Sequence, residues 1–245
     1  MTSRRPQLRS LSLVRHAESA GNVANDAALA AGHHELDLAI RDMDVPLSPL
    51  GEVQACALGS WLGGLDPAPS VLVSSPYRRA VDTAALAMEA SGRRLPVLLD
   101  ERLREREFGI LDRLTKPGIE ARHPEQAAAR AFLGKLYHRP PGGESWADVA
   151  GRVRSALADL RLDHADEDVV VVTHQAVITL FRYVLEHLDE PTLLDLDRRE
   201  QIANTAVCTY EVDDDGELRL MTWNDTVHLP AETTTDAPDV PVAPR

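Results

Sequence analysis

The sequence has no long apolar run and only two cysteines. Its apolar stretches are far shorter than the ~20 residues of a membrane span. The opening residues, MTSRRPQLRS, are not followed by the apolar core of a signal peptide. Cys56 and Cys208 lie far apart without C-x-x-C spacing, so nothing suggests a disulfide framework or a thiolate metal site. We therefore expect a soluble, cytoplasmic protein with reduced thiols.

Positive charge is also scarce. The chain has 26 lysines and arginines against 39 acidic residues, a formal net charge of −13. Nucleic-acid binders normally carry a basic stripe, so we expect no nucleic-acid partner, and an anionic ligand would need a local basic pocket. The 44% of apolar residues in a chain of 245 suffice for a buried core. We expect one domain over residues 1–229 and a disordered tail over residues 230–245, which are rich in Thr, Pro and Asp.

Strand and helix patterns alternate along the chain. Short apolar runs bounded by turn residues predict strands at 11–16, 71–76, 95–100 and 168–174. Helical spacing predicts helices at 49–63, 77–91, 145–162 and 175–188. Ser145 and Asp148 resemble a capping box, and an Asp-Gly turn within 206–224 predicts a hairpin. The order predicts an α/β fold, a three-layer α/β/α sandwich with a mostly parallel sheet, helices on both faces and a C-terminal β-hairpin.

Basic side chains and histidines gather at the carboxyl ends of these strands. Arg15 and His16 end the first strand, and His174 ends the fourth. Arg78 and Arg79 follow the second strand. In an open parallel sheet, ligands bind at this edge, where helix N-termini also point. One histidine there could equally be a buried core residue, but two histidines with several arginines indicate a site.

These residue types suit phosphoryl transfer. Guanidinium groups bind phosphate oxygens in pairs and stay protonated. A neutral imidazole nitrogen attacks phosphorus when the other ring nitrogen donates to a backbone carbonyl. The leaving oxygen needs a proton, which a carboxylic acid supplies if its pKa is raised. The candidates for this acid are Glu18, Glu105 and Glu107.

The run RHAES at 15–19, followed by Asn22, resembles the signature of the histidine phosphatase superfamily, branch 1, the phosphoglycerate mutase-like clan. The segments VPLSPLGEVQACALG, SSPYRRAVDTA, LREREFG and VVVVTHQAV are similar to further family motifs in the same chain order. The resemblance spans residues 11 to about 177. It implies the fold expected above, with a small helical cap inserted at about 110–144.

The resemblance also implies catalytic roles. His16 would be the nucleophile that becomes a phosphohistidine. Arg15, Arg79 and His174 would hold the phosphoryl oxygens, while Glu105 would protonate the leaving alcohol and then act as base. No metal and no cofactor are expected, because the arginines and the histidine supply the positive charge.

Asn22, Gln175 and Lys116 are the expected substrate-binding residues. Two positions depart from the family pattern. Ala17 replaces a glycine, which is costly if that residue must take φ > 0. Gln175 stands where many relatives have glycine, a change expected to affect substrate shape more than chemistry.

We expect a metal-independent phosphomonoesterase that acts on a small anionic phosphate ester through a phosphohistidine. The alternatives are phosphoglycerate mutase-type transfer and a non-catalytic phospho-ligand binding domain. Lys116 matches the family's cap lysine in spacing, but Phe132 and Leu133 stand where mutases carry an arginine pair, so hydrolysis is favoured. The sequence leaves the substrate and the oligomeric state open, a homodimer included. The cap cations that could hold a second anionic group, or simply face solvent, are Lys116, Arg122, Arg130, Lys135 and Arg139.

Overall fold

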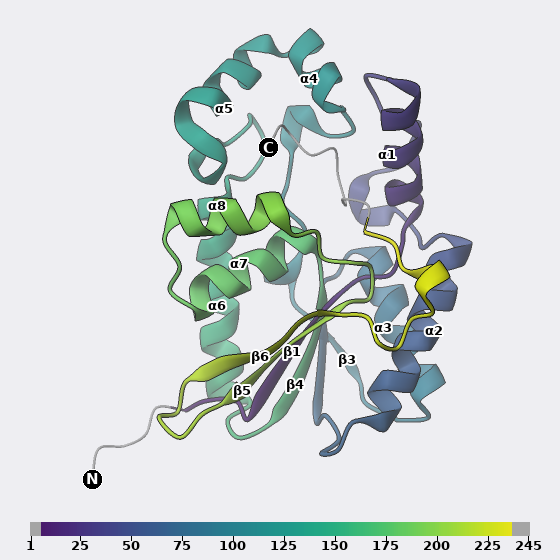
Figure 1. Ribbon diagram of the computed structural model, residues 1–245, viewed down its shortest axis with the longest axis vertical. Coiled ribbons are helices and arrows are strands. Elements are labelled where there is room, and N and C mark those ends of the chain that lie inside the picture. The colour runs from purple at the N-terminus through teal and green to yellow at the C-terminus, as the bar shows by residue number, and fades with distance from the viewer. Residues whose placement is uncertain (1–5, 237–245) are drawn as a thin grey trace.

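The computed structural model describes residues 6–236 and has a six-stranded sheet with the order β3-β2-β4-β1-β5-β6 (Figure 1). β1 to β4 run parallel to one another, β5 pairs antiparallel with β1, and β6 pairs antiparallel with β5. The predicted mostly parallel sheet with a C-terminal hairpin is therefore confirmed. The strands are Ser10–Arg15 (β1), Val71–Ser74 (β2), Val97–Leu99 (β3), Asp168–Thr173 (β4), Val207–Val212 (β5) and Leu218–Asp225 (β6).

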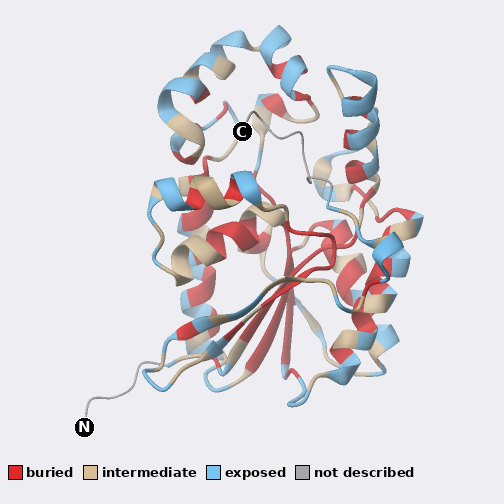
Figure 2. Ribbon diagram, in the orientation of Figure 1, coloured by how far each residue is buried: buried red, intermediate tan, exposed pale blue. Residues whose placement is uncertain are grey.

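Helices cover both faces of the sheet. The side chains of β4 illustrate this arrangement, because they are buried on both faces. Successive side chains of a strand point to opposite faces. Val169 and Val171 pack in one core with α6 and α7, whereas Val170 and Val172 pack in a second core with α2 and α3. Figure 2 shows these central strands buried along their length. The α-helices are Ala20–Ala31 (α1), Pro49–Gly64 (α2), Arg78–Ser91 (α3), Lys116–Arg122 (α4), Pro124–Tyr137 (α5), Trp146–Asp163 (α6), Gln175–Leu185 (α7) and Glu190–Arg199 (α8).

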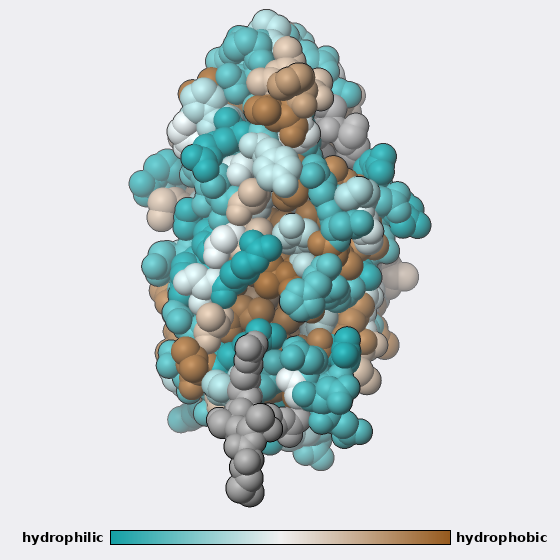
Figure 3. All heavy atoms as spheres, turned by 90° about the vertical axis from the view of Figure 1, so that its left-hand side faces the viewer, coloured by the Kyte–Doolittle hydropathy of each residue, from teal (hydrophilic) through white to brown (hydrophobic). Residues whose placement is uncertain are grey.

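The helical cap lies beyond the carboxyl ends of the strands. It consists of α4 and α5, preceded by a 3-10 turn at Gly109–Leu111 (Figure 1). α1 lies across from the cap on the same end of the sheet (Figure 1). The segment that follows α1 forms hydrogen bonds with the cap. There the Thr115 amide donates to the His34 carbonyl at 3.1 Å, and Glu35 forms a β-bridge with Leu114. The face that carries α5 and α6 has hydrophobic and hydrophilic side chains interspersed (Figure 3).

Two expectations about helix ends and the tail were wrong. The helix that starts at Gln175 ends at Leu185 instead of Leu188, because His187 takes φ +53°. Residues 230–236 are ordered against the core, and Gln54 Nε2 donates to the Thr233 carbonyl at 2.7 Å and to Thr235 Oγ1 at 2.9 Å. The rest of the expected tail, 237–245, lies outside the described residues. Within 6–236, none of the helices has the length and apolar character that crossing a membrane requires.

Candidate active site

His16, Arg15, Arg79 and His174 meet at the carboxyl edge of the sheet. Arg15 ends β1, His16 follows it, Arg79 lies in the first turn of α3 and His174 follows β4. All four are at most 1% exposed. The two imidazole centroids are 5.1 Å apart, and Arg79 Nε donates to His16 Nε2 at 3.2 Å. The sheet therefore brings together side chains that lie far apart in the sequence. Arg15 and His174, for example, are separated by 159 positions.

The backbone fixes the tautomer of His16. His16 Nδ1 lies 2.7 Å from the Ala17 carbonyl oxygen. A carbonyl oxygen only accepts, so Nδ1 carries the hydrogen and Nε2 keeps its lone pair. The main chain is held as well, because the His16 amide donates to the Thr173 carbonyl at 2.9 Å and its carbonyl accepts from Asn204 Nδ2 at 3.0 Å. Nε2 is thus the ring nitrogen that carries the lone pair a nucleophile needs.

Ala17 fits its position without backbone strain. It is not among the described residues with φ > 0, so the cost that a required positive φ would impose does not arise. Its amide donates to Thr83 Oγ1 at 3.0 Å, and its methyl group packs in a small buried cluster with Leu47 and Ala55. An alanine here is compatible with the site.

The two buried arginines have different partners. Arg15 Nη1 donates to the Ile202 carbonyl at 2.6 Å. Arg79 Nη1 donates to the carbonyl and to Oδ1 of Asp42 at 2.7 and 2.9 Å, and Arg79 Nη2 donates to Oδ2 at 3.2 Å. Arg78, its sequence neighbour, is exposed and pairs with Asp82. No sequence motif pointed to Asp42.

Ser75 and Tyr77 support His174 and Arg79. His174 Nε2 lies 2.8 Å from Ser75 Oγ, which also accepts from the Tyr77 amide at 3.2 Å. The Tyr77 ring is close to both groups, with its centroid 5.2 Å from that of the His174 ring and 5.1 Å from Arg79 Cζ. Burial, with nearby Asp42 and other carboxylates, raises the pKa of Tyr77 well above its usual range, so the phenol stays neutral. Both residues belong to the SSPY segment and were overlooked in the sequence.

Glu105 is the buried carboxylate among the three candidate acids. It is 2% exposed, and its Oε1 accepts from the Arg106 amide at 2.7 Å. Glu18 instead accepts from Ser48 Oγ at 2.6 Å. Glu107 is exposed and accepts from the Gly109 amide. Glu105 is therefore the most deeply buried of the three candidates.

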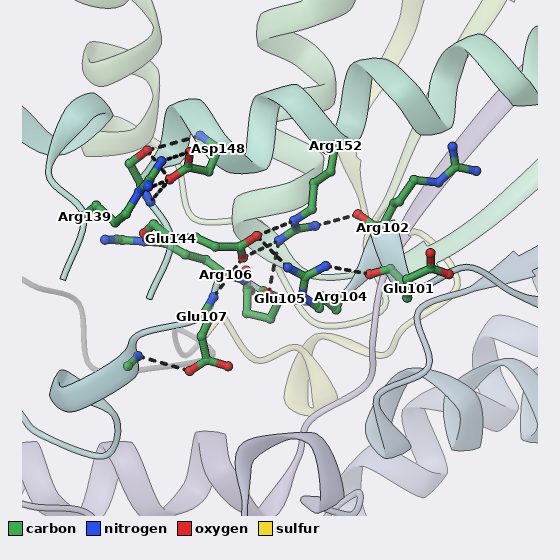
Figure 4. Close-up of polar contacts among 12 residues, drawn as sticks. Glu101, Arg102, Arg104, Glu105, Arg106, Glu107, Arg139, Glu144, Asp148 and Arg152 are labelled. Atoms are coloured by element: carbon green, nitrogen blue, oxygen red, sulfur yellow. Dashed lines mark hydrogen bonds and ion pairs between the residues drawn. The ribbon is translucent and has the colours of Figure 1, made fainter. Parts of the chain in front are cut away.

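Side chains near and in α6 hold the backbone around Glu105, as Figure 4 shows. Arg152 Nη1 donates to the Arg102 carbonyl at 2.6 Å, and its Nη2 donates to the Glu105 carbonyl at 3.2 Å. Glu144 accepts from Arg104 Nη2 and from Arg152, and its carbonyl accepts from Arg106 Nε at 2.7 Å. α6 itself begins at the predicted Ser145–Asp148 capping box. The backbone around Glu105 is thus bound to α6 and to the segment just before it.

The predicted substrate-binding residues lie in three different places. Asn22 is fully buried in the first turn of α1, where its side chain accepts from the Ser19 amide in a capping box. Gln175 opens α7, and its Nε2 donates to Gln201 Oε1 at 2.7 Å. Lys116 is exposed at the start of α4. Their roles toward a substrate stay predictions.

The other cap cations are engaged with acidic groups or buried. Arg122 pairs with Glu35, Arg139 pairs with Asp148, and Lys135 pairs with the buried Asp197. Arg130 is 8% exposed, and burial lowers its pKa. Over residues 6–236, no group of three or more His, Cys, Asp or Glu side chains is arranged to hold a metal ion.

The fold and this edge define an α/β protein with two buried histidines held beside two buried arginines. The family assignment agrees with that description. The sequence profile of the histidine phosphatase superfamily (branch 1) matches residues 11–226, and the chain belongs to this family.

Curated relatives include phosphatases and mutases. The glucosyl-3-phosphoglycerate phosphatase of Mycobacterium tuberculosis (strain ATCC 25618 / H37Rv) is 39% identical over 144 residues, which cover 56% of this chain and 62% of that protein. The match therefore spans less than two thirds of that relative. A 2,3-bisphosphoglycerate-dependent phosphoglycerate mutase of Methylobacterium radiotolerans is 33% identical over 194 residues, 78% of this chain and 85% of that protein.

A solved structure extends the likeness over most of the chain. The mycobacterial glucosyl-3-phosphoglycerate phosphatase in complex with inorganic phosphate superposes with a TM-score of 0.69 at 29% identity. The superposition covers 91% of this chain and 100% of that one.

Proposed function

We propose that this protein is a metal-independent phosphomonoesterase that hydrolyses a small anionic phosphate ester through a phosphohistidine. One observation carries the proposal. His16 has its Nδ1–H committed to the Ala17 carbonyl, which leaves Nε2 as a nucleophile among Arg79, Arg15 and His174. The phosphatase relatives support the same reading. A cytoplasmic location stays a prediction from the sequence.

In the first step, His16 Nε2 attacks phosphorus and the bond from phosphorus to the ester oxygen breaks. Arg15, Arg79 and His174 stabilise the charge on the phosphoryl oxygens. Glu105 gives its proton to the departing alcohol oxygen. The positive charge that develops on the imidazole is stabilised by the Nδ1–H bond to the Ala17 carbonyl.

In the second step, the Glu105 carboxylate takes a proton from a water molecule. The water oxygen attacks phosphorus, the bond from phosphorus to Nε2 breaks, and inorganic phosphate leaves. His16 returns to its neutral tautomer and Glu105 is protonated again. Each step uses only side chains of this chain, which is the basis for proposing that no metal is required.

Phosphoglycerate mutase-type transfer is the second candidate, because a mutase relative matches 78% of the chain. A mutase must retain its substrate until the phosphoryl group returns. At the cap positions where mutases are expected to carry an arginine pair, Phe132 is 89% exposed and Leu133 is 48% exposed. Neither side chain can bind a substrate carboxylate by charge, so hydrolysis remains the better proposal.

The test is phosphate release from a panel of phosphomonoesters in EDTA, by the wild type and by His16→Ala. His33→Ala, which removes an exposed histidine, is the matched control. We expect release by the wild type and the control and none by His16→Ala, with an acid-labile phosphoenzyme in the active proteins. Release that survives in His16→Ala contradicts the nucleophile assignment. Transfer seen only with a diphosphorylated activator would favour the mutase.

A further inference from the structure

The Asp42 carboxylate is bound to the arginine that is expected to bind phosphate. Arg79 Nη1 and Nη2 donate to Oδ1 and Oδ2 of Asp42 at 2.9 and 3.2 Å, and Nη1 also donates to the Asp42 carbonyl at 2.7 Å. This two-pronged arrangement is the one in which a guanidinium binds a phosphate group. Arg79 is 1% exposed, so its guanidinium is shielded from water.

We propose that Asp42 competes with the phosphoryl group for Arg79 and thereby sets the affinity of the site for phosphate. The inference rests on the proposed function, because it takes the Arg79 guanidinium as part of the phosphate site. Asp42 acts only through Arg79 and is not a catalytic residue.

Arg79 is placed so that the competition affects the reacting atoms. Its Nε donates to His16 Nε2, the nucleophilic nitrogen, while the opposite edge of the same guanidinium is bound to Asp42. A phosphoryl group facing His16 must take its hydrogen bonds from this guanidinium. Nη1 donates to the carbonyl oxygen and Oδ1 of Asp42, and Nη2 donates one hydrogen to Oδ2. A phosphoryl oxygen that takes one of these hydrogens therefore displaces an oxygen of Asp42.

Asp42 has space into which its side chain can withdraw. Its side chain is 27% exposed, and it borders a cavity of about 490 Å³ that Glu107 and Asp112 also line. Burial raises the pKa of Asp112, with Asp42 and Glu107 adding to the effect, so the carboxylates of this cavity repel one another. Arg113 and Arg41 line it too. Arg41 is bound to Asp44, and Arg113 Nη1 donates to the Leu38 carbonyl. A displaced Asp42 therefore exchanges its buried partner for a cavity that it shares with two further carboxylates.

The cost of this exchange applies to substrate and product alike. Both contain the same phosphoryl oxygens, so losing the pair between Asp42 and Arg79 weakens the binding of both. An effect of equal size on the ground state and the transition state changes KM and not kcat. Asp42 thus raises KM and also speeds the release of inorganic phosphate from a pocket with two buried guanidinium groups.

A role for Asp42 in aiming Arg79 at the substrate predicts the opposite effect on phosphate binding. If Asp42 only aimed Arg79 at the substrate, removing its charge would loosen Arg79 and weaken phosphate binding. Asp42→Asn separates the two roles, because the amide keeps the shape of the side chain and residue 42 keeps the carbonyl that accepts from Arg79 Nη1.

The experiment is a calorimetric titration of the wild type and Asp42→Asn with inorganic phosphate, together with KM and kcat for p-nitrophenyl phosphate. We expect the Kd for phosphate and the KM each to fall about tenfold, with kcat within about twofold. The control is Asp44→Asn, which removes the same charge from the same 3-10 turn at Asp42–Asp44 but breaks only a surface pair with Arg41. Its Kd should equal that of the wild type.

The outcomes separate this inference from the proposed function. Unchanged or weaker phosphate binding by Asp42→Asn, with normal binding by the wild type, overturns the inference alone. An equal gain in Asp44→Asn also overturns it, because the effect would then be long-range charge and not the contact with Arg79. A wild type that binds no phosphate overturns the proposed function and this inference with it. Asp42→Ser, measured in parallel, gives the same comparison if the asparagine variant unfolds.

Discussion

A Cβ atom at Gly51 would lie 1.9 Å from the carbonyl oxygen of Glu18. The contact joins the first turn of α2 to the loop that follows His16. The same Glu18 carbonyl accepts from the Ser48 amide at 2.9 Å, and Ser48 Oγ caps α2 by accepting from the Gly51 amide. Only glycine allows the two backbones to approach this closely, so the first turn of α2 holds the loop that joins His16 to α1 in place.

We predict that Gly51→Ala forces this loop away from the helix. Overpacking of this kind typically costs about 1–3 kcal/mol, and the backbone contact here places the loss toward the upper end. Turnover should fall too, since the loop is continuous with His16. Gly151→Ala is the control, because nothing lies within 4 Å of its added Cβ inside α6. It should raise the free energy of unfolding by up to about 1 kcal/mol. Urea unfolding that leaves Gly51→Ala as stable as the wild type would contradict the prediction.

Glu105→Gln tests the proposed proton donor. Alkyl phosphates need a proton on the leaving oxygen, whereas p-nitrophenolate leaves with little help. We expect kcat on alkyl phosphates to fall by about 10²–10⁴-fold and the rate on p-nitrophenyl phosphate to fall much less. Glu107→Gln, two residues along and exposed, should leave both rates near the wild type. Equal losses on both substrate types would count against the role of Glu105.

Arg152→Met tests how the acid is positioned. Methionine keeps an apolar stem along α6 but removes the donors to the Arg102 and Glu105 carbonyls. We expect roughly a tenfold loss of kcat, concentrated on alkyl phosphates as in Glu105→Gln, with KM unchanged. Arg154→Met, which alters an exposed arginine of the same helix, is the matched control. A loss of the same size for every leaving group would show that Arg152 serves stability alone.

The sequence predicted the parts of the site that depend on local pattern. Strand runs that end in His16 and His174 fix where those side chains must lie, because the carboxyl ends of parallel strands share one edge. The strand that precedes SSPYRRA indicated both Arg78 and Arg79, and the resemblance of this segment to a family motif selected Arg79. Burial separates Glu105 from Glu18 in the structure.

The remaining parts depend on contacts between distant segments. Asp42 lies 37 residues from Arg79 in a stretch without periodicity, so no local pattern pairs them. α1 was not predicted, because its buried side has small or polar residues such as Gly21, Ala28 and Asn25 instead of an apolar stripe. The composition of 230–236 suggests disorder, yet polar side chains of Gln54 and Asn204 supply its hydrogen bonds.

Lys135 gives the fold a distinctive dependence on pH. Its ammonium group pairs with Asp197 and lies 4.2 Å from the centre of the Trp146 ring. Burial lowers the pKa of Lys135 to about 8, although Asp197 opposes the shift, and the neighbouring Arg130 and Arg106 lower it further. In the unfolded chain a lysine pKa is about 10.4. Between about 8 and about 10.4, the unfolded state therefore binds more protons than the folded state, and the contribution of this group to stability rises with pH.

We accordingly predict that the wild type gains stability relative to Lys135→Met as the pH is raised from 7 to 9.5. Below about pH 8 the wild type carries the cost of a buried charge, which deprotonation then relieves. Methionine does not titrate, so the difference in the free energy of unfolding between the two proteins isolates this group from every other titration. Urea unfolding at several pH values measures it, and Lys116→Met, at an exposed lysine of the same cap, should show a constant difference. A difference for Lys135→Met that stays flat or moves the other way would mean that the pair with Asp197, and not burial, governs the protonation of this lysine.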